Sequence, residues 1–459
     1  MSVLDYGLIG HPLEHSLSPF IHQRLLGCAG LPGIYRLYDI KADQLEDTVN
    51  RLSRELAGYN CTIPYKEAII PYLKELDETA DYIRSVNTVK AFKGYNTDYA
   101  AFNHECPLKK GQNVLLLGAG GISRTMAFAA AEAGCKIWIV ARRKEQAVRL
   151  GESVRKQNSQ AILYCSDSME EWRQIVKGET AEAVNLQQPF ILLNGTPVGM
   201  WPKVSGLWMD KEDLNFISYV YDTIYNPVAT RLVLLARSRQ IPAKGGLGML
   251  FQQALAAQKI WNPTAVFPES DLLQIRRDLA QAIFRLFPVT IVLCGFMGSG
   301  KTTVGRLLSK KMSLPFLDLD AWIEQKAGRA ISEIFAENGQ LAFRALERSA
   351  LAEALSQPQS KILAAGGGAL LSKEAEEILR SHPALVVYLD VYMDEILQRV
   401  GHGEGRPMLA DQDRASWVNL YLQRQPRYQE LADLTVDGNG PPEKVAAAIY
   451  QNLGLEERS

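Results

Sequence analysis

Residues 290–303 read TIVLCGFMGSGKTT, and this stretch decides the fold of the C-terminal part of the chain. The apolar run Thr290 to Cys294 is typical of a buried parallel strand. The run leads into the pattern G-x-x-x-x-G-K-[ST], whose glycines turn backbone N–H groups toward a phosphate chain at the start of a helix. Lys301 can reach the terminal phosphates, and the hydroxyl of Thr302 can bind magnesium. The stretch therefore predicts a nucleotide-binding domain that begins near residue 290.

The composition of the 459-residue chain is that of a soluble globular protein, with 47% hydrophobic and 22% charged residues. Its length favours about three domains. The net charge of −1 argues against a nucleic-acid-binding face or a polybasic membrane contact. The N-terminus lacks the pattern of a signal peptide, and no apolar run approaches the ~18 residues of a membrane span. The six cysteines form no C-x-x-C pair, which favours reduced thiols in the cytoplasm.

Polar residues gather early in the chain, between residues 11 and 22. Three histidines lie there, but their spacing matches no zinc pattern. Ser16 and Ser18 flank Leu17 just before an expected helix, where two hydroxyls suit a polyol or a carboxylate. The alternative, that Ser18 only caps a helix beginning with Pro19, fits the sequence equally well.

Three further polar motifs follow at the ends of expected strands: NCTIPYK at 60–66, SVNTV at 85–89 and GYNTD at 94–98. Together with H-S-x-S-P at 15–19, their order and spacing resemble the substrate lobe of shikimate dehydrogenase. The resemblance implies that a polyhydroxy cyclohexene carboxylate is held by Ser16, Ser18, Thr62, Lys66, Asn87 and Asp98.

Hydride transfer between a ketone and an alcohol needs a proton donor or acceptor at the oxygen. A lysine–aspartate pair closed off from water supplies one, because the carboxylate orients the ammonium. We therefore expect Lys66 to carry out acid–base catalysis and Asp98 to orient it.

A second motif, NVLLLGAGGIS at 113–123, combines an apolar strand, a glycine-rich turn and a helix start. A second strand at 136–140 completes a βαβ unit of the dinucleotide-binding type. Ser123 stands where the third glycine of G-x-G-x-x-G falls. The motif predicts a cofactor-binding turn made by Gly118, Ala119, Gly120, Gly121 and Ser123.

The end of that second strand bears on the choice of cofactor. NAD-binding proteins usually place an acid there for the ribose 2′-hydroxyl, but this chain has Ala141, Arg142 and Arg143. Two guanidinium groups suit a 2′-phosphate, so the sequence favours NADP over NAD, with a solvated basic turn as the alternative. Shikimate dehydrogenases usually read N-R-T here, and Ala141 departs from that pattern.

Three later segments, at 194–200, 221–230 and 246–254, extend the resemblance over residues 3–270. They resemble the loop beside the nicotinamide, the segment whose tyrosine contacts substrate, and the helix that returns to the first lobe. The resemblance implies cofactor contacts from Thr196, Gly246 and Met249. It implies substrate contacts from Tyr225 and Gln253, with Gln252 as the alternative to Gln253.

The C-terminal part carries further motifs around the phosphate-binding loop. Asp318 and Asp320 end a strand on one face, Arg344 lies on an expected helix, and Gly366–Gly368 end another strand. With R-x-x-x-Y at 424–428 and R-P-M-L at 406–409, the set resembles shikimate kinase over residues 290–455. Gluconate and nucleoside monophosphate kinases share this fold, but paired arginines favour a small carboxylate.

The kinase resemblance implies a role for each motif residue. Asp320 is the expected base, with Lys301 and Arg406 stabilising the transferring phosphoryl group. The substrate is expected to contact Arg344, Gly367, Gly368 and Arg424. ATP is expected to contact Gly298, Ser299, Gly300, Lys301, Thr302, Thr303 and Arg399. Magnesium is expected at Thr302 and Asp318.

The sequence thus predicts an α/β chain: a two-lobed dehydrogenase with a Rossmann-like NADP lobe, followed by a P-loop kinase whose parallel sheet is flanked by helices, as in nucleoside monophosphate kinases. We expect a dehydrogenase at 1–270, with a substrate lobe at about 1–99 and 245–270 and an NADP lobe at about 100–244. A helical joint at 271–288 leads to a kinase at 289–459.

The expected function is that of a bifunctional enzyme of aromatic amino acid biosynthesis that uses NADP(H), ATP and Mg²⁺. It would reduce 3-dehydroshikimate to shikimate and phosphorylate shikimate at the same oxygen. Two alternatives remain at this point: a catabolic quinate/shikimate dehydrogenase joined to a sugar-acid kinase, and a non-catalytic shikimate-sensing regulator. The expected partners are small molecules, and nothing in the sequence indicates an oligomeric state.

Overall fold

The computed structural model describes residues 4–179, 189–400 and 414–455. Contacts divide the chain into two compact units. The first contains residues up to 197 together with 209–225 and 244–280, and the second contains 198–208, 226–243 and the chain from 281 onward. A helix, α10 (Glu269–Leu286), occupies the segment expected as the joint. The domain boundaries given above stay a prediction.

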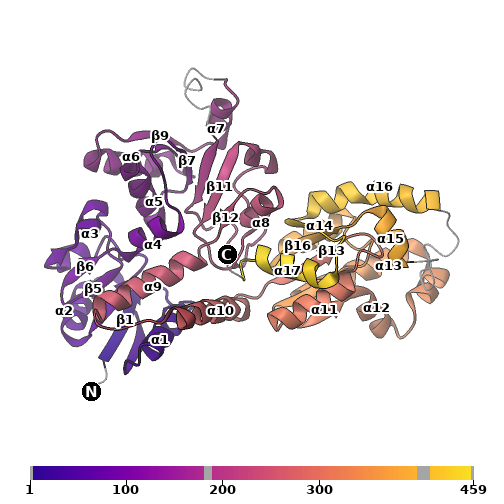
Figure 1. Cartoon of the computed structure of the whole chain (residues 1–459), viewed down its shortest axis with the longest axis horizontal. Helices are drawn as coiled ribbons and strands as arrows, with labels where there is room; N and C mark the ends of the chain where they lie inside the picture. Colours follow the sequence, from indigo (N-terminus) through magenta and orange to yellow (C-terminus); the bar gives the residue numbers. More distant parts are fainter. Residues whose placement is uncertain (1–3, 180–188, 401–413, 456–459) are drawn as a thin grey trace. The chain divides into compact units, whose positions relative to one another are not determined.

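The part of the first unit expected as the substrate lobe is built on a six-stranded sheet of order β2-β1-β3-β5-β6-β4. Figure 1 labels β1, β5 and β6 of this sheet. β1 pairs in parallel with β2 and β3, while β5 runs antiparallel to β3 and β6. The strands are β1 (Leu4–Gly10), β2 (Gly33–Asp39), β3 (Gly58–Cys61), β4 (Glu75–Leu76), β5 (Thr88–Lys90) and β6 (Lys93–Tyr95). The helices are α1 (Ser18–Cys28), α2 (Leu45–Glu55) and α3 (Glu78–Ile83), with short 3₁₀ turns at Ala42–Gln44 and Ile70–Tyr72.

A second six-stranded sheet follows, of order β12-β11-β10-β7-β8-β9. The strands are β7 (Asn113–Leu117), β8 (Lys136–Val140), β9 (Ile162–Ser166), β10 (Phe190–Asn194), β11 (Ile217–Asp222) and β12 (Ala243–Lys244). The helices are α5 (Gly121–Glu132), α6 (Lys144–Gln157), α7 (Met169–Val176) and α8 (Arg231–Ser238), with a 3₁₀ turn at Lys211–Phe216. The parallel strands β7 and β10 are buried along their whole length, as expected for apolar runs covered on both faces. Strand order reverses between β7 and β10, where open sheets of this type bind ligands.

Two helices of the first unit connect its sheets. α4 (Thr97–Glu105) follows β6 and precedes β7, and α9 (Leu247–Trp261) follows β12. α9 packs against both α4 and α1 (Figure 1). The polar residues at the start of α4 are therefore held by the same framework as α1.

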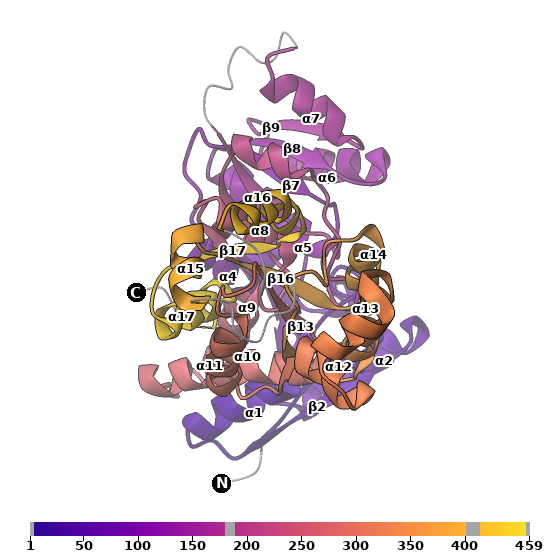
Figure 2. The same ribbon diagram turned by 90° about the vertical axis from the view of Figure 1, so that its right-hand side faces the viewer.

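The kinase part of the second unit has a five-stranded parallel sheet of order β14-β15-β13-β16-β17. The strands are β13 (Thr290–Cys294), β14 (Phe316–Asp318), β15 (Lys361–Ala364), β16 (Ala384–Asp390) and β17 (Leu434–Asp437). The helices are α11 (Lys301–Met312), α12 (Leu319–Ala327), α13 (Ile331–Ser356), α14 (Lys373–Ser381), α15 (Met393–Val400), α16 (Arg414–Leu431) and α17 (Pro442–Asn452). α11 packs with α17 and α13 with α14, and Figure 2 shows these pairs on opposite sides of the strands.

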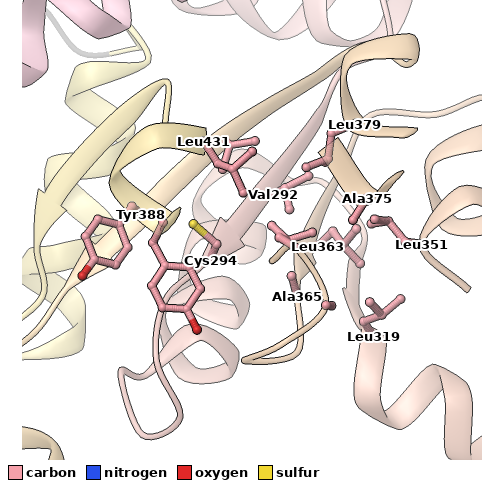
Figure 3. Close-up of a cluster of buried hydrophobic side chains, with 14 of the residues drawn as sticks. Val292, Cys294, Leu319, Leu351, Leu363, Ala365, Ala375, Leu379, Tyr388 and Leu431 are labelled. Atoms are coloured by element: carbon pink, nitrogen blue, oxygen red, sulfur yellow. The ribbon is translucent and has the colours of Figure 1, made fainter. Parts of the chain in front are cut away.

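The core of this sheet explains why its strands are apolar throughout. Figure 3 shows side chains of β13 and β15 meeting those of the covering helices. The cluster includes Val292, Cys294, Leu319, Leu351, Leu363, Ala375, Leu379, Tyr388 and Leu431. Each is at most 2% exposed, so the loops at the carboxyl ends of the strands rest on a rigid base.

These sheets confirm the predicted α/β class, with a Rossmann-like lobe and a P-loop-type parallel sheet. Among the helices in the described part of the chain, none is long and apolar enough to cross a membrane.

Candidate active sites

Lys66 and Asp98 lie together in the first unit, as expected. Lys66 follows the turn after β3, and Asp98 lies in the first turn of α4. The Lys66 Nζ donates to Asp98 Oδ2 at 2.6 Å, and the two side chains are 21% and 10% exposed. A pair that is partly shielded from water keeps its geometry while one edge stays open to a ligand.

Asn87 is buried beside this pair and holds the start of α4. Its Oδ1 accepts a hydrogen bond from the backbone N–H of Thr97 at 2.8 Å. Its Nδ2 donates to Thr97 Oγ1 at 2.9 Å. Asn87 thus orients the residue next to Asp98, in addition to its expected contact with substrate.

The loop before α1 contains Ser16 and Ser18, both half-buried. α1 begins at Ser18, and the residue at its cap position is Leu17, with no side-chain cap. The idea that Ser18 caps this helix is therefore wrong. Ser16 Oγ accepts from the Ser18 N–H at 3.3 Å, which shapes the loop. Thr62 is half-buried and directly follows β3.

Tyr225 and the glutamines of α9 are the other expected substrate contacts. Burial raises the pKa of Tyr225, so its phenol stays protonated near neutral pH and can donate a hydrogen bond. Gln253 donates from Nε2 to Leu250 O at 2.8 Å. Gln252 and Gln253 are both half-buried, so the choice between them stays open.

The glycine-rich turn after β7 is shaped for a phosphate group. Gly118 has φ of +97°, and a Cβ there would come within 2.9 Å of Thr196 Cγ2. At Gly120 and Gly121 a Cβ would meet nothing within 4 Å, so the space over the helix start is open. Gly120 caps α5 without any side-chain cap, which leaves backbone N–H groups directed toward an anion.

Ser123 has a different place from the one expected. It is fully buried, and its Oγ donates to Gly195 O at 3.4 Å. A Cβ at Gly195 would lie only 2.2 Å from Ser123 Oγ. Ser123 therefore packs α5 closely against the loop after β10, which is the packing role of the third glycine in the usual motif.

The remaining cofactor residues divide into exposed and buried groups. Arg142 and Arg143 are exposed at the end of β8, whereas Ala141 and Met249 are at most 5% exposed. Thr196 donates from its N–H and its hydroxyl to Asn194 Oδ1, which fixes the loop after β10. The two arginines are thus more accessible to a cofactor than Ala141 or Met249.

Gly246 occupies the cap position of α9 and cannot carry a side chain. A Cβ there would lie 2.1 Å from Thr223 O. The close approach brings the start of α9 against the strand end of β11, beside the expected nicotinamide loop.

In the second unit, the phosphate-binding loop opens into a cavity of about 1170 Å³. Its lining joins the loop to the other kinase motifs. The expected residues that line it are Gly298, Ser299, Gly300, Lys301, Thr302, Thr303, Asp318, Asp320, Arg344, Gly367, Gly368, Arg399 and Arg424. One cavity therefore contains the expected nucleotide, metal and substrate residues.

Thr302 and Asp318 form the expected edge for a metal ion. Thr302 Oγ1 donates to Asp318 Oδ2 at 2.7 Å, while Asp318 Oδ1 accepts from the Asp320 N–H at 3.1 Å and caps α12. Within the described residues, no three His, Cys, Asp or Glu side chains group to hold a metal by themselves. A hydroxyl and one carboxylate, completed by phosphate oxygens and water, is a donor set that suits Mg²⁺.

Lys301 is held inside its own loop. Its Nζ donates to Gly295 O and Phe296 O, each at 2.9 Å. Gly298 and Gly300 have φ of +82° and +91°, which lets the loop wrap around this ammonium. The Lys301 ammonium thus lies at the centre of the phosphate-binding loop, where phosphate oxygens are expected.

The opposite end of the cavity gathers positive charge around a glycine turn. Arg424 donates to Gly367 O at 3.2 Å. A Cβ at Gly368 would lie 2.2 Å from the Arg344 guanidinium, and one at Gly366 would lie 2.5 Å from Asp320 Oδ1. The lack of side chains at Gly366 and Gly368 lets the Asp320 carboxylate and the Arg344 guanidinium approach the turn this closely.

Arg399 lies beside the phosphate-binding loop. It donates to Gly438 O at 2.9 Å and pairs with Glu395 at 3.0 Å. Its position is compatible with the expected contact to the nucleotide. Arg406 and the rest of the R-P-M-L motif lie outside the described residues.

Comparisons with known proteins identify the family of each part of the chain. Residues 8–89 match the shikimate dehydrogenase substrate binding domain, and residues 297–454 match shikimate kinase. Two relatives named shikimate dehydrogenase (NADP(+)) come from Caldanaerobacter subterraneus subsp. tengcongensis and Methanocaldococcus jannaschii. Each is 34% identical, over 58% of this chain and 94% of the relative. The chain belongs to the shikimate dehydrogenase family.

Solved structures support the same assignment. A shikimate dehydrogenase in complex with NADP⁺ matches with a TM-score of 0.51 and 30% identity, covering 61% of this chain and 96% of that one. A chorismate mutase/shikimate 5-dehydrogenase fusion protein from Clostridium acetobutylicum matches with a TM-score of 0.52 and 29% identity, covering 62% and 99%. The family match over residues 297–454 adds a shikimate kinase domain, as the motifs predicted.

Two residues of the kinase domain were not assigned a role from the sequence. Glu347 is buried and forms an ion pair with Arg344. Burial raises the pKa of Glu347, and the Arg344 guanidinium opposes this effect. Tyr428 donates from its hydroxyl to Gly367 O. Arg344 and Glu347 are three residues apart on a helix, a spacing from which the first contact could have been predicted, whereas the second contact joins distant parts of the chain.

Proposed function

We propose that the chain is a bifunctional enzyme that reduces 3-dehydroshikimate to shikimate and then phosphorylates shikimate to shikimate 3-phosphate. The proposal rests on one combination of observations: both families match the chain, and in each part the reactive side chains lie within reach of one another. NADPH supplies the hydride when bound, and MgATP supplies the phosphoryl group.

In the dehydrogenase, Lys66 gives a proton to the oxygen that becomes the 3-hydroxyl, and the same residue takes it back in the reverse direction. Asp98 accepts a hydrogen bond from the Lys66 ammonium at 2.6 Å and holds it in place. Ser16, Ser18, Thr62, Asn87, Tyr225 and one glutamine of α9 hold the ring hydroxyls and the carboxylate.

In the kinase, Asp320 accepts the proton of the 3-hydroxyl, and Lys301 and Arg406 stabilise the negative charge that develops on phosphoryl transfer. Arg344 and Arg424 hold the carboxylate of the acid at the glycine turn Gly366–Gly368. Thr302 and Asp318 would hold the magnesium ion, which would neutralise charge on the phosphates.

We place the enzyme in the cytoplasm with small-molecule partners. All six cysteines are free thiols, four of them buried. Burial raises the pKa of Cys61 to about 12, so this thiol stays protonated and unreactive.

Steady-state assays of the two half-reactions test the proposal. NADP should be preferred over NAD, and shikimate over quinate, in spectrophotometric assays of the dehydrogenase. A preference for quinate and NAD would favour the catabolic alternative, and binding of shikimate without turnover would favour a regulator.

The two arginines after β8 should decide the cofactor preference. Replacing both Arg142 and Arg143 with alanine is expected to raise the KM for NADP by about tenfold or more, since a hydrogen bond to a charged group contributes roughly 1.5–3 kcal/mol. The KM for NAD should change little. Lys144→Ala, at the exposed first residue of α6, is the matched control. An unchanged KM for NADP in the double variant would show that the turn is merely solvated.

A further inference from the structure

A layer of buried polar side chains lies under the expected substrate residues of the dehydrogenase. Tyr35 on β2 and Asn60 on β3 are both 5% exposed. Tyr35 donates from its hydroxyl to Asn60 Oδ1 at 2.7 Å. Asn60 in turn donates from Nδ2 to Asn87 O at 3.1 Å and to Thr88 Oγ1 at 3.0 Å. We call these residues, with Thr97, the Tyr35 layer.

The Tyr35 layer leads directly to the catalytic pair. Asn87 and Thr97 exchange two hydrogen bonds, from the Thr97 N–H to Asn87 Oδ1 and from Asn87 Nδ2 to Thr97 Oγ1. Thr97 precedes Asp98, whose carboxylate holds Lys66. An unbroken series of hydrogen bonds therefore runs from Tyr35 to the backbone that positions Asp98.

Two backbone groups, one that can only donate and one that can only accept, fix which atoms donate and which accept along these hydrogen bonds. The backbone N–H of Thr97 can only donate, so Oδ1 of Asn87 faces it. The backbone carbonyl of Asn87 can only accept, so Nδ2 of Asn60 faces it and Oδ1 of Asn60 is left to accept from Tyr35. A tyrosine hydroxyl at position 35 is thus the donor that satisfies the Asn60 oxygen and holds its amide in this orientation.

On its other side, Tyr35 contacts α1, the helix that begins at Ser18. Burial raises the pKa of Tyr35 well above its ordinary value, and an interaction with the Ser18 hydroxyl opposes this effect. The Tyr35 ring stacks on His22 of α1, with 4.2 Å between the ring centroids. Burial lowers the pKa of His22 to about 3, so its ring is neutral and adds no charge beside the phenol.

We propose that Tyr35 is a positioning residue for shikimate: it acts through the side chains that bind the substrate and not by direct contact. Through its stacking on His22 of α1 on one side and its hydrogen bond to Asn60 on the other, it sets the spacing between α1, which begins at Ser18, and the side chains around Asn87. The inference rests on the proposed dehydrogenase activity. It adds a specificity determinant that lies on β2, away from every motif of the site.

Tyr35→Phe tests this inference, because it keeps the ring and removes only the donor. The KM for shikimate, measured by NADP reduction, is expected to rise about tenfold. The reason is that Asn60 Oδ1 is left as a buried acceptor without its donor, so the Asn60 amide is no longer held in this orientation. The KM for NADP and the kinase activity should stay at their native values. Tyr38→Phe, the same change on the same strand, should behave like the native protein.

Two results would overturn the inference. One is an unchanged KM for shikimate in Tyr35→Phe while the native protein is active. The other is an equal rise in the KM values for shikimate and NADP, which would indicate a general loosening of the unit. Should Tyr35→Phe fail to bind NADP, Thr88→Val breaks the Tyr35 layer one step further on and must show the same selective rise. An inactive native protein would instead contradict the proposed function itself.

Discussion

Replacing Lys66 with alanine is expected to abolish the NADP-dependent oxidation of shikimate, with a loss of about 10²–10⁴-fold in kcat. The reason is that Lys66 is the proton donor and acceptor, held by Asp98 at 2.6 Å. Shikimate phosphorylation should continue at the native rate in the same preparation. Both rates are measured with purified protein, by absorbance of NADPH and by release of ADP.

Lys41→Ala provides a matched control, since Lys41 is an exposed lysine of the same unit. It should retain both activities. Full dehydrogenase activity in Lys66→Ala would remove this residue from the mechanism. A loss of both activities without unfolding would contradict the idea of two independent sites.

Replacing Lys301 with alanine is expected to have the opposite effect. Kinase activity should fall by about 10²–10³-fold, as for the loss of one charged group that stabilises a transition state. The Lys301 ammonium already lies at the centre of the phosphate-binding loop, bound to Gly295 O and Phe296 O. Reduction of 3-dehydroshikimate should be unaffected.

Lys310→Ala, an exposed lysine on the same helix α11, is the control for this experiment. A thermal melt of each variant separates loss of function from loss of fold. If Lys301→Ala phosphorylated shikimate at the native rate, the cavity would not be the kinase site.

The sequence was most informative at strand ends. Several motifs stand where an apolar strand ends: the phosphate-binding glycines, the motifs of Lys66 and Asp98, and the paired acids at 318 and 320. Because the carboxyl ends of parallel strands meet at one edge of a sheet, such motifs are brought together by any fold of this class. The α/β class followed from these local signals, whereas the pairing of Lys66 with Asp98 was implied by the resemblance to shikimate dehydrogenase.

Contacts between distant buried residues could not be predicted in the same way. Tyr35 and Asn60 look like ordinary strand residues, and nothing in their own strands shows that one donates to the other. Ser123 stands in a cofactor motif, yet it is buried against Gly195, a residue on a later strand end. Such roles depend on how strands pair, which periodicity alone does not give.

The loop before α1 shows why local rules are not always sufficient. A serine followed by proline is a common helix start, and the sequence allowed Ser18 to be a cap. The helix instead begins one residue earlier than that rule requires, with Leu17 at the cap position. The loop conformation, with Ser16 accepting from the Ser18 N–H, decided the outcome.

A coupled assay tests the central claim most directly. The purified chain is given 3-dehydroshikimate, NADPH and MgATP, and the products are followed by mass spectrometry. Two active sites that accept the same acid should yield shikimate 3-phosphate, with equal amounts of NADPH oxidised and ADP formed. Shikimate that accumulates without a phosphorylated product, or 3-dehydroshikimate that is left unreduced, would contradict the account.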